Sequence, residues 1–411
     1  MTKSIPANAM WSDPPRAGLV VTCAPLEIGA EQANIMPAKA RAALEGLPIE
    51  LVVVEAPVFD IPAALGAAER LIHANIDLVV WLAATWSFDS LALEFLRLCP
   101  APLLAWGLPG METGSLCGSQ QLIEVLTELE RPCVFVHGAL GDASAHARIF
   151  DFARAAAASQ RLKRARFGML GHRTAGMTEV AFHEYDLARQ FGVLVYYRGA
   201  ERLLADAATT PTAGAEIIWS RTKQRCGKCA VSDEEGLQAA RCCLAMREWA
   251  LEEQLHGIAV GCYPDLMGVV CLGCSLLAEE GIVTACEGDM NSTVLTAAMH
   301  LMAGRPIHNT DLLDVDSADN TCTLSHCGNS AISLAQDEKQ VALAHVRLMD
   351  QGVVARYSGA PGCVTIANLS GARDTYRLTC YAGEAVPTEM VFPGIPVKVK
   401  LETPIDQFLE Q

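Results

Sequence analysis

Short, uninterrupted apolar runs that alternate with helical segments are the feature of this sequence that most restricts its fold. In the N-terminal part, such runs are separated by Ala- and Leu-rich helical patterns and occur at Gly18–Cys23, Ile49–Val54, Ile76–Leu82, Pro102–Trp106 and Pro132–Val136. A strand that is apolar on both sides is buried on both faces, and strand–helix alternation places such strands in a parallel sheet. The sequence therefore predicts a doubly wound, Rossmann-like α/β domain over residues 1–155.

The same alternation restarts further along the chain. Asp142 is expected to cap a helix that extends to Gln160 and leads into a second α/β domain over residues 156–340. From residue 341 to 411 the runs are of β type, punctuated by Gly and Pro and without helical partners. They predict a small C-terminal antiparallel β domain.

Composition and charge narrow the class of partner. The chain has 31 Lys and Arg against 47 Asp and Glu, a net charge of −16, which argues against a nucleic-acid or anionic-membrane partner. No stretch reaches the roughly 18 apolar residues of a membrane span, and the first residues lack the apolar core of an export signal. We expect a soluble, cytoplasmic protein.

Most of the sixteen cysteines lie within apolar runs, as expected of small buried side chains in a reducing compartment. One group leaves a structural zinc module open as an alternative. Cys226 and Cys229 have the spacing of a zinc ribbon, but Cys242 and Cys243 are adjacent, which is a poor geometry for one tetrahedral ion.

Two aspartates mark the candidate active site. Asp265 and Asp289 each follow an apolar strand and precede a helix. Ligands of open α/β sheets bind at the carboxyl ends of the strands, so neighbouring strands would place both carboxylates in one crevice. His326 ends a polar, strand-like segment and adds an imidazole, and this donor set favours Mn²⁺. A helix N-cap for either aspartate and a simple hydrogen-bonded histidine are the plainer alternatives.

The segments that carry these residues resemble a known family. Cys262-Tyr-Pro-Asp265, Ala285-Cys-Glu-Gly-Asp289 and His326-Cys-Gly328, in this order, are similar to the C-terminal half of the L-fucose/L-arabinose isomerase superfamily, and most similar to the fucose isomerase branch. A weaker resemblance covers residues 171–177 and 85–89. The resemblance to this superfamily implies two Rossmann-like domains and a C-terminal β domain. It also implies a trimer or hexamer with active sites between subunits, and aldose–ketose isomerisation as the activity.

The resemblance also implies roles for the three residues. Family members hold Mn²⁺ with a Glu, an Asp and a His, which correspond by position to Asp265, Asp289 and His326. The two carboxylates would also be the acid/base pair that moves a proton between C1 and C2 through an enediol. The ion would polarise the carbonyl and the neighbouring hydroxyl of the sugar.

Three further residues complete the expected site. The resemblance suggests that Trp86 stacks on the sugar and that Arg173 binds it, while core packing and a surface ion pair are the plainer explanations for these two side chains. Glu287 lies two residues before Asp289 and is expected to face the same side along a strand. There it would contact the metal ligands without binding the ion itself.

Departures from the family point away from L-fucose. Asp265 stands where the family usually has Glu, and the segment after the first strand lacks the substrate-contacting Arg. We therefore expect an isomerase of another sugar, such as the sulfonated hexose sulfoquinovose, whose anionic group would meet Arg173, His172 or Arg221. A non-catalytic sugar-binding protein on the same fold is the alternative.

Overall fold

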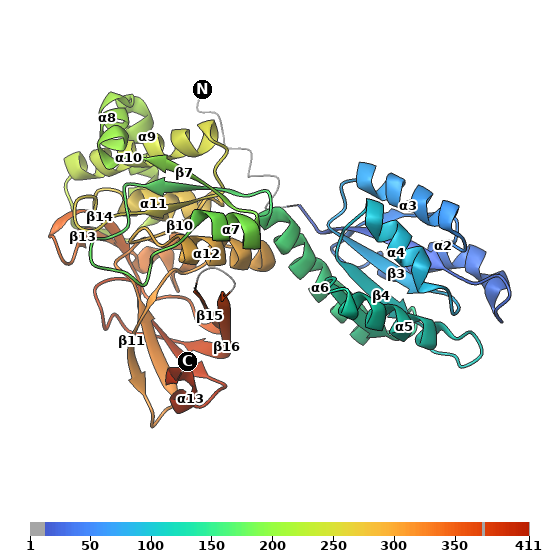
Figure 1. Ribbon diagram of the computed structural model, residues 1–411. Coiled ribbons are helices and arrows are strands. Elements are labelled where there is room, and N and C mark those ends of the chain that lie inside the picture. Colours follow the sequence, from blue (N-terminus) through green and yellow to red (C-terminus); the bar gives the residue numbers. More distant parts are fainter. Residues whose placement is uncertain (1–12, 372–374, 411) are drawn as a thin grey trace. The chain divides into compact units, whose positions relative to one another are not determined.

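The computed structural model describes residues 13–371 and 375–410, which form two units, Asp13–Gln160 and Arg161–Gln411, taken in turn below (Figure 1). The N-terminal unit is built on a parallel sheet with the order β2-β1-β3-β4-β5. Its strands are β1 (Arg16–Thr22), β2 (Glu50–Val53), β3 (Leu78–Ala83), β4 (Leu103–Gly107) and β5 (Cys133–His137).

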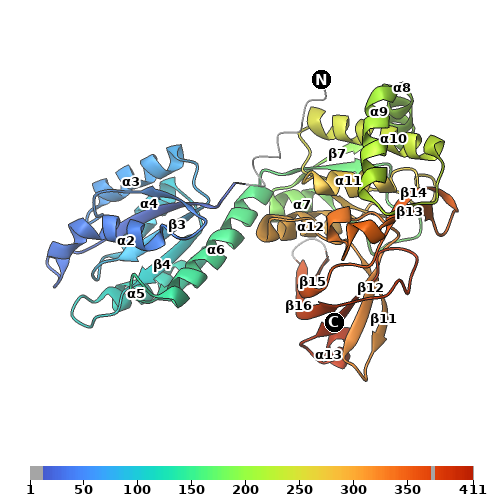
Figure 2. The ribbon, with the colours of Figure 1, turned by 180° about the vertical axis from the view of Figure 1, so that it is seen from behind.

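Helices cover both faces of this sheet (Figures 1 and 2). They are η1 (Ala30–Ile35), α2 (Met36–Leu44), α3 (Ile61–His73), α4 (Asp89–Leu98), α5 (Ser115–Glu128) and α6 (Ala143–Leu162). One buried cluster joins α2 and α6 to one face, and a second joins α3, α4 and α5 to the other. Asp142 accepts a hydrogen bond from the Ser144 backbone N–H at 2.8 Å, as predicted for the start of α6.

The second unit contains another parallel sheet, with the order β10-β9-β6-β7. Its strands are β6 (Arg166–Leu170), β7 (Leu194–Arg198), β9 (Gly257–Val260) and β10 (Val283–Ala285). One face packs on α8 (Ala200–Thr209), α10 (Asp233–Glu252) and α11 (Cys271–Glu279), and the other on α7 (Glu184–Phe191) and α12 (Met290–Ala303). Helix α9 (Thr212–Arg225) packs on α10.

An antiparallel sheet completes this unit, with the order β11-β12-β17-β16-β15. Its strands are β11 (Asp311–Asp316), β12 (Thr321–Ser325), β15 (Gly362–Ser370), β16 (Arg377–Val386) and β17 (Val397–Leu401). A small sheet joins β8 (Lys228–Cys229), β13 (Ala342–Val346) and β14 (Gln351–Arg356); η2 (Ile332–Leu334), η3 (Glu338–Gln340) and α13 (Ile405–Leu409) are short. The predicted parallel α/β sheets and the antiparallel sheet are thus confirmed, although the antiparallel sheet also includes β11 and β12, which lie before residue 341.

None of the helices in the described part of the chain is long and apolar enough to cross a membrane.

Candidate functional site

Three loops of the second unit meet at the carboxyl ends of β6, β9 and β10. β9 pairs in parallel with β6 on one side and with β10 on the other, which confirms that the strands before Asp265 and Asp289 are neighbours. The Gly288 N–H donates to the Val260 carbonyl at 3.0 Å, and the Thr174 N–H donates to the Glu287 carbonyl at 3.0 Å. Backbone hydrogen bonds therefore tie the loop after β10 to the other two.

Glycines let these loops approach closely. A Cβ on Gly261 would collide with the His172 carbonyl oxygen, and one on Gly288 would lie 2.8 Å from the Arg173 Cα. Gly288 also has a φ of +71°, in the left-handed region that favours glycine. The predicted site segments of this unit therefore meet backbone to backbone.

Asp289 lies at the start of α12 and caps it. Its Oδ1 accepts from the Ser292 N–H at 2.9 Å and its Oδ2 from the Ser292 hydroxyl at 2.6 Å. The plainer N-cap alternative is thus observed, although each carboxylate oxygen keeps a lone pair for another partner. Burial raises the pKa of Asp289, the Ser292 hydrogen bonds lower it, and the carboxylate of Glu179 raises it further.

Glu287 is the group whose sequence interpretation changes most. β10 ends at Ala285, and Glu287 has a left-handed backbone with a φ of +65°, so the expectation that it lies on a strand beside Asp289 is wrong. Burial, followed by the carboxylates of Asp311, Asp289 and Glu179, raises the pKa of Glu287 to about 7. A half-buried carboxyl group of this kind can both accept and release a proton near neutrality.

His326 is buried directly after β12, with a side chain that is 6% exposed. Its Nδ1 accepts from the Cys327 N–H at 2.8 Å, and its Nε2 lies 3.9 Å from Oδ2 of Asp311 on β11. Burial lowers the pKa of His326, while Asp311 opposes that shift. Burial, with the nearby His326, also lowers the pKa of His308 to about 3, and the His308 Nε2 atom is buried without a partner among the described residues.

Sequence reasoning missed Glu179, His308 and Asp311. None of them follows an apolar strand of the parallel sheet, which was the signal that identified the two aspartates. Asp311 comes close because β11 pairs with β12 in a register that places it opposite Ser325, beside His326. A repeating pattern in the sequence does not encode that register.

Asp265 lies in the turns between β9 and α11, and its side chain is exposed. Across residues 13–371 and 375–410, no three His, Cys, Asp or Glu side chains come close enough together to hold a metal ion. Asp265, Asp289 and His326 are therefore not gathered around one point in this structure. The four cysteines of the zinc alternative are likewise not gathered: Cys229 is exposed, whereas Cys226, Cys242 and Cys243 are buried.

A cavity of about 640 Å³, which is within the usual range for small-molecule sites, lies beside the loop that follows β6. It is lined by the end of β6, the residues that follow it, the segment before and at the start of α7, and Tyr197 of β7. Arg173 and His172 line it, and Arg173 is also the residue whose backbone meets Gly288. The cavity and the carboxylate loop therefore share a wall.

The polar groups of this cavity are partly paired. Arg173 donates from Nη1 to the Met177 carbonyl, and the His172 Nδ1 lies 2.8 Å from the Arg173 carbonyl. The Tyr197 hydroxyl donates to Glu184 at 2.7 Å, and burial together with that carboxylate raises the pKa of Tyr197 to about 12. Arg221 is exposed on α9 and does not line the cavity.

Trp86 belongs to the N-terminal unit, just after β3. It is half-buried: its Nε1 donates to Gln121 at 3.1 Å, and its ring packs edge-on against Phe88 with centroids 4.9 Å apart. The preceding Thr85 hydroxyl accepts from the Ala24 N–H at 2.9 Å, which links the loops after β3 and β1. These adjacent strands flank the point where the strand order of the sheet reverses, a usual ligand position in such sheets.

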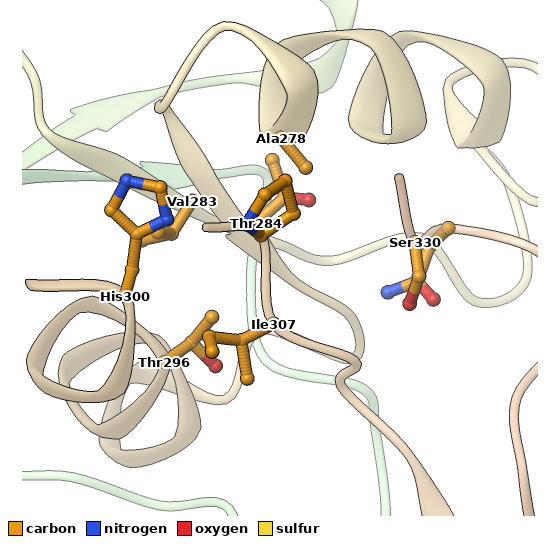
Figure 3. Close-up of a pocket in the computed structure, with 9 residues that line it drawn as sticks. Ala278, Val283, Thr284, Thr296, His300, Ile307 and Ser330 are labelled. Atoms are coloured by element: carbon orange, nitrogen blue, oxygen red, sulfur yellow. The ribbon is translucent and has the colours of Figure 1, made fainter. Parts of the chain in front are cut away.

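A second, much smaller cavity of about 10 Å³ lies between α12 and β10 (Figure 3). Thr284, Thr296 and His300 line it together with Ser330 and Asn329. The Ser330 hydroxyl and the Asn329 amide are buried with no hydrogen-bond partner within the described ranges. The volume corresponds to about one water molecule, so this cavity is too small for a sugar.

Comparison with known proteins adds the class of activity. No family model matches the chain. A sulfoquinovose isomerase of Priestia aryabhattai is 24% identical over 388 residues, covering 91% of this chain and 86% of that protein. One from Alkalicoccus urumqiensis is 25% identical over 365 residues, covering 85% and 82%. An ABC transporter solute-binding protein from Agrobacterium vitis covers 72% of this chain and 91% of its own at 11% identity, but its TM-score of 0.19 is too low to carry an argument.

The chain is accordingly an enzyme, an intramolecular oxidoreductase of the sugar-isomerase class that interconverts an aldose and a ketose. It aligns with named isomerases along most of its length, and the residues of the candidate site lie within a fold of the expected α/β type. The similarity does not support the alternative of a non-catalytic sugar-binding protein.

Proposed function

We propose that this enzyme isomerises the sulfonated aldose sulfoquinovose to its ketose through an enediol, with the assistance of Mn²⁺. The observation that carries the proposal is the group of carboxylates around the loop after β10, Glu287, Asp289 and Asp311, with His326 beside Asp311, in a chain whose curated relatives are sulfoquinovose isomerases. Proton transfer between adjacent carbons needs such groups close to the substrate.

The donor chemistry of the site fits the proposed ion. Burial raises the pKa values of Glu287 and Asp289, and the nearby Glu179 carboxylate adds to both shifts; a divalent cation would offset this negative charge. Carboxylate oxygens with one imidazole are ligands that suit Mn²⁺. We assign the ligand role to Asp265, Asp289 and His326, which would have to come closer together than they lie in this structure to hold the ion. When bound, the ion would polarise the sugar carbonyl and stabilise the negative charge of the enediolate.

The side chains of the protein would orient the carboxylates and transfer the proton. Ser292 holds both oxygens of Asp289 and keeps this carboxylate oriented as a base. Asp265 and Asp289 form the proposed acid/base pair, one carboxylate accepting the proton from C2 and a carboxyl group returning a proton at C1. Glu287 lies near Asp289, and its half-buried position allows it to exchange protons with that carboxylate.

Deuterium exchange tests the proposed chemistry. Sulfoquinovose is incubated in D₂O with added Mn²⁺ and either the wild type or Asp289→Asn, and isotope at C1 and C2 is measured by NMR. We expect incorporation with the wild type and a loss of about 10²–10⁴-fold with the variant, the usual contribution of a positioned acid or base. Equal incorporation by both proteins would exclude Asp289 from the proton transfer.

We also propose that the enzyme works as a homo-oligomer. Large apolar side chains are exposed in the loops at the carboxyl ends of β1 to β4: Leu26, Ile28, Phe59, Phe88 and Met111, which we call the apolar rim. Leu26 is 100% exposed and Met111 98%. Several large apolar side chains exposed at one edge of a sheet are typical of protein interfaces, and a second copy of the chain is the partner that we assign to them.

A further inference from the structure

We infer that the 640 Å³ cavity binds the sulfonate end of the substrate, with Arg173 and His172 as its anion-binding side chains, and that it selects a singly charged sulfonate over a doubly charged phosphate. This inference rests on the proposed function and specifies which part of the structure binds the charged group of the substrate. Nothing in the similarity to the relatives assigns this role to these residues.

The position of the cavity supports the assignment. Arg173 lines it, and the Arg173 backbone touches the loop that carries Glu287 and Asp289 through Gly288. A hexose that reaches the carboxylates with its C1 and C2 atoms can therefore extend its far end along the shared wall. Phe182, Tyr185 and Tyr197 supply apolar ring surface for the sugar between these two ends.

Arg173 is suited to an oxyanion. One N–H of its guanidinium donates to the Met177 carbonyl, which holds the side chain in place, and its other N–H groups have no partner among the residues that the structure describes. A guanidinium offers parallel donors that match two oxygens of one anionic group. The His172 Nδ1 donates to the Arg173 carbonyl at 2.8 Å, so Nε2 can donate to a second oxygen when the ring is protonated.

The balance of charge in the cavity sets the preference. Arg173 is the permanent cation of the lining, and the carboxylate of Glu184 lies in the same lining, bonded to Tyr197. His183 also lines the cavity, but its Nδ1 lies 3.3 Å from Asp186, so its positive charge is compensated when it is protonated. A sulfonate carries one negative charge, whereas a phosphate ester carries about −1.5 to −2 at pH 7. The second charge would face Glu184 without a cation to balance it.

Specificity ratios test the inference. The value of kcat/KM is measured for sulfoquinovose, glucose and glucose 6-phosphate with the wild type, Arg173→Ala, Glu184→Gln and, as a control, Arg202→Ala, an exposed arginine of α8 paired with Asp206. We expect Arg173→Ala to reduce the ratio of sulfoquinovose to glucose at least about tenfold, as loss of a charge-assisted contact does. Glu184→Gln should raise the kcat/KM for glucose 6-phosphate, relative to that for sulfoquinovose, several-fold.

Two results would overturn the inference: a ratio that Arg173→Ala leaves unchanged, or a wild type that prefers glucose 6-phosphate. Because Arg173 also holds the Met177 turn, His172→Ala repeats the test if Arg173→Ala does not fold. A wild type that isomerises none of the three sugars would refute the proposed function alone. In that case, calorimetry of sulfoquinovose binding tests whether the cavity holds the sulfonate. Binding by the wild type that Arg173→Ala abolishes supports the inference, and absence of binding by the wild type refutes it.

Discussion

The Nε2 atom of the buried His326 lies 3.9 Å from an oxygen of Asp311, a carboxylate that is 59% exposed on the neighbouring strand. Asp311 begins β11 and His326 directly follows β12, and the antiparallel pairing of these strands brings the two residues together. The negative charge of Asp311 lies beside the proposed ligand His326 and increases the attraction of this position for a cation.

Asp311→Asn should therefore weaken Mn²⁺ binding about tenfold, within the range found when a partner of a ligand is removed. Titration of the free-ion electron paramagnetic resonance signal measures the affinity. Asp316→Asn, at the other end of the same strand opposite Thr321, is the matched control and should leave the affinity unchanged. Equal affinities for the wild type and Asp311→Asn would contradict a role for Asp311 at the site.

Two substitutions of Asp289 separate its proposed catalytic role from its capping role. Both Asp289→Asn and Asp289→Ala should abolish isomerisation, but asparagine can still accept from Ser292 and cap α12. Only the alanine variant should lose about 1 kcal/mol of stability in urea denaturation. An asparagine variant that remains active would show that this carboxylate is not an acid/base group.

His256 should make the enzyme less stable in acid. Burial lowers the pKa of His256 to about 4, and its Nδ1 accepts from the Arg166 N–H at 3.1 Å. The unfolded chain, with a histidine pKa near 6.5, binds this proton more readily, so stability is retained above pH 6.5 and falls as the pH decreases from 6.5 towards 4. By pH 5 the loss is about 2 kcal/mol. Urea denaturation should show that the free energy of unfolding changes less between pH 7.5 and pH 5 in His256→Gln than in the wild type. The same change in both proteins would refute the assignment to His256.

The cysteines should react in two classes. Cys117, Cys229, Cys363 and Cys380 are exposed, so four of the sixteen thiols should react rapidly with an aromatic disulfide reagent in the native protein and all sixteen in denaturant. A zinc module would instead protect Cys229 and release zinc upon reaction. Detection of one zinc per chain together with only three rapid thiols would reinstate that alternative.

Charges introduced into the apolar rim should dissociate the oligomer. Leu26→Asp together with Met111→Asp places two carboxylates in a surface that we expect another copy to bury. Light scattering should show a mass that falls from a multiple of 43.9 kDa to 43.9 kDa. Leu129→Asp, an exposed leucine at the end of α5, serves as the control. A wild type that is already monomeric would refute the oligomer.

The fold was predictable from the sequence to the extent that periodic patterns encode it. Continuous apolar runs such as Leu78–Ala83 identify strands buried on both faces, and the position of Asp289 after such a run identified the carboxyl edge of the sheet. The left-handed backbone of Glu287 and its raised pKa were not predictable. They depend on burial and on Asp311 and Glu179, residues that only the folded chain brings near.

The close backbone contact among the loops has a consequence for how this enzyme can diversify. Gly261 and Gly288 leave no room for side chains between the loop that carries the carboxylates and the loop that carries Arg173. The main chain thereby holds the two loops in register, while other lining residues of the 640 Å³ cavity, Glu184, Tyr185 and Tyr197, come from α7 and β7. Substrate preference can then be rewritten by exchanging lining residues such as Glu184 or Tyr185, without disturbing the groups that transfer the proton.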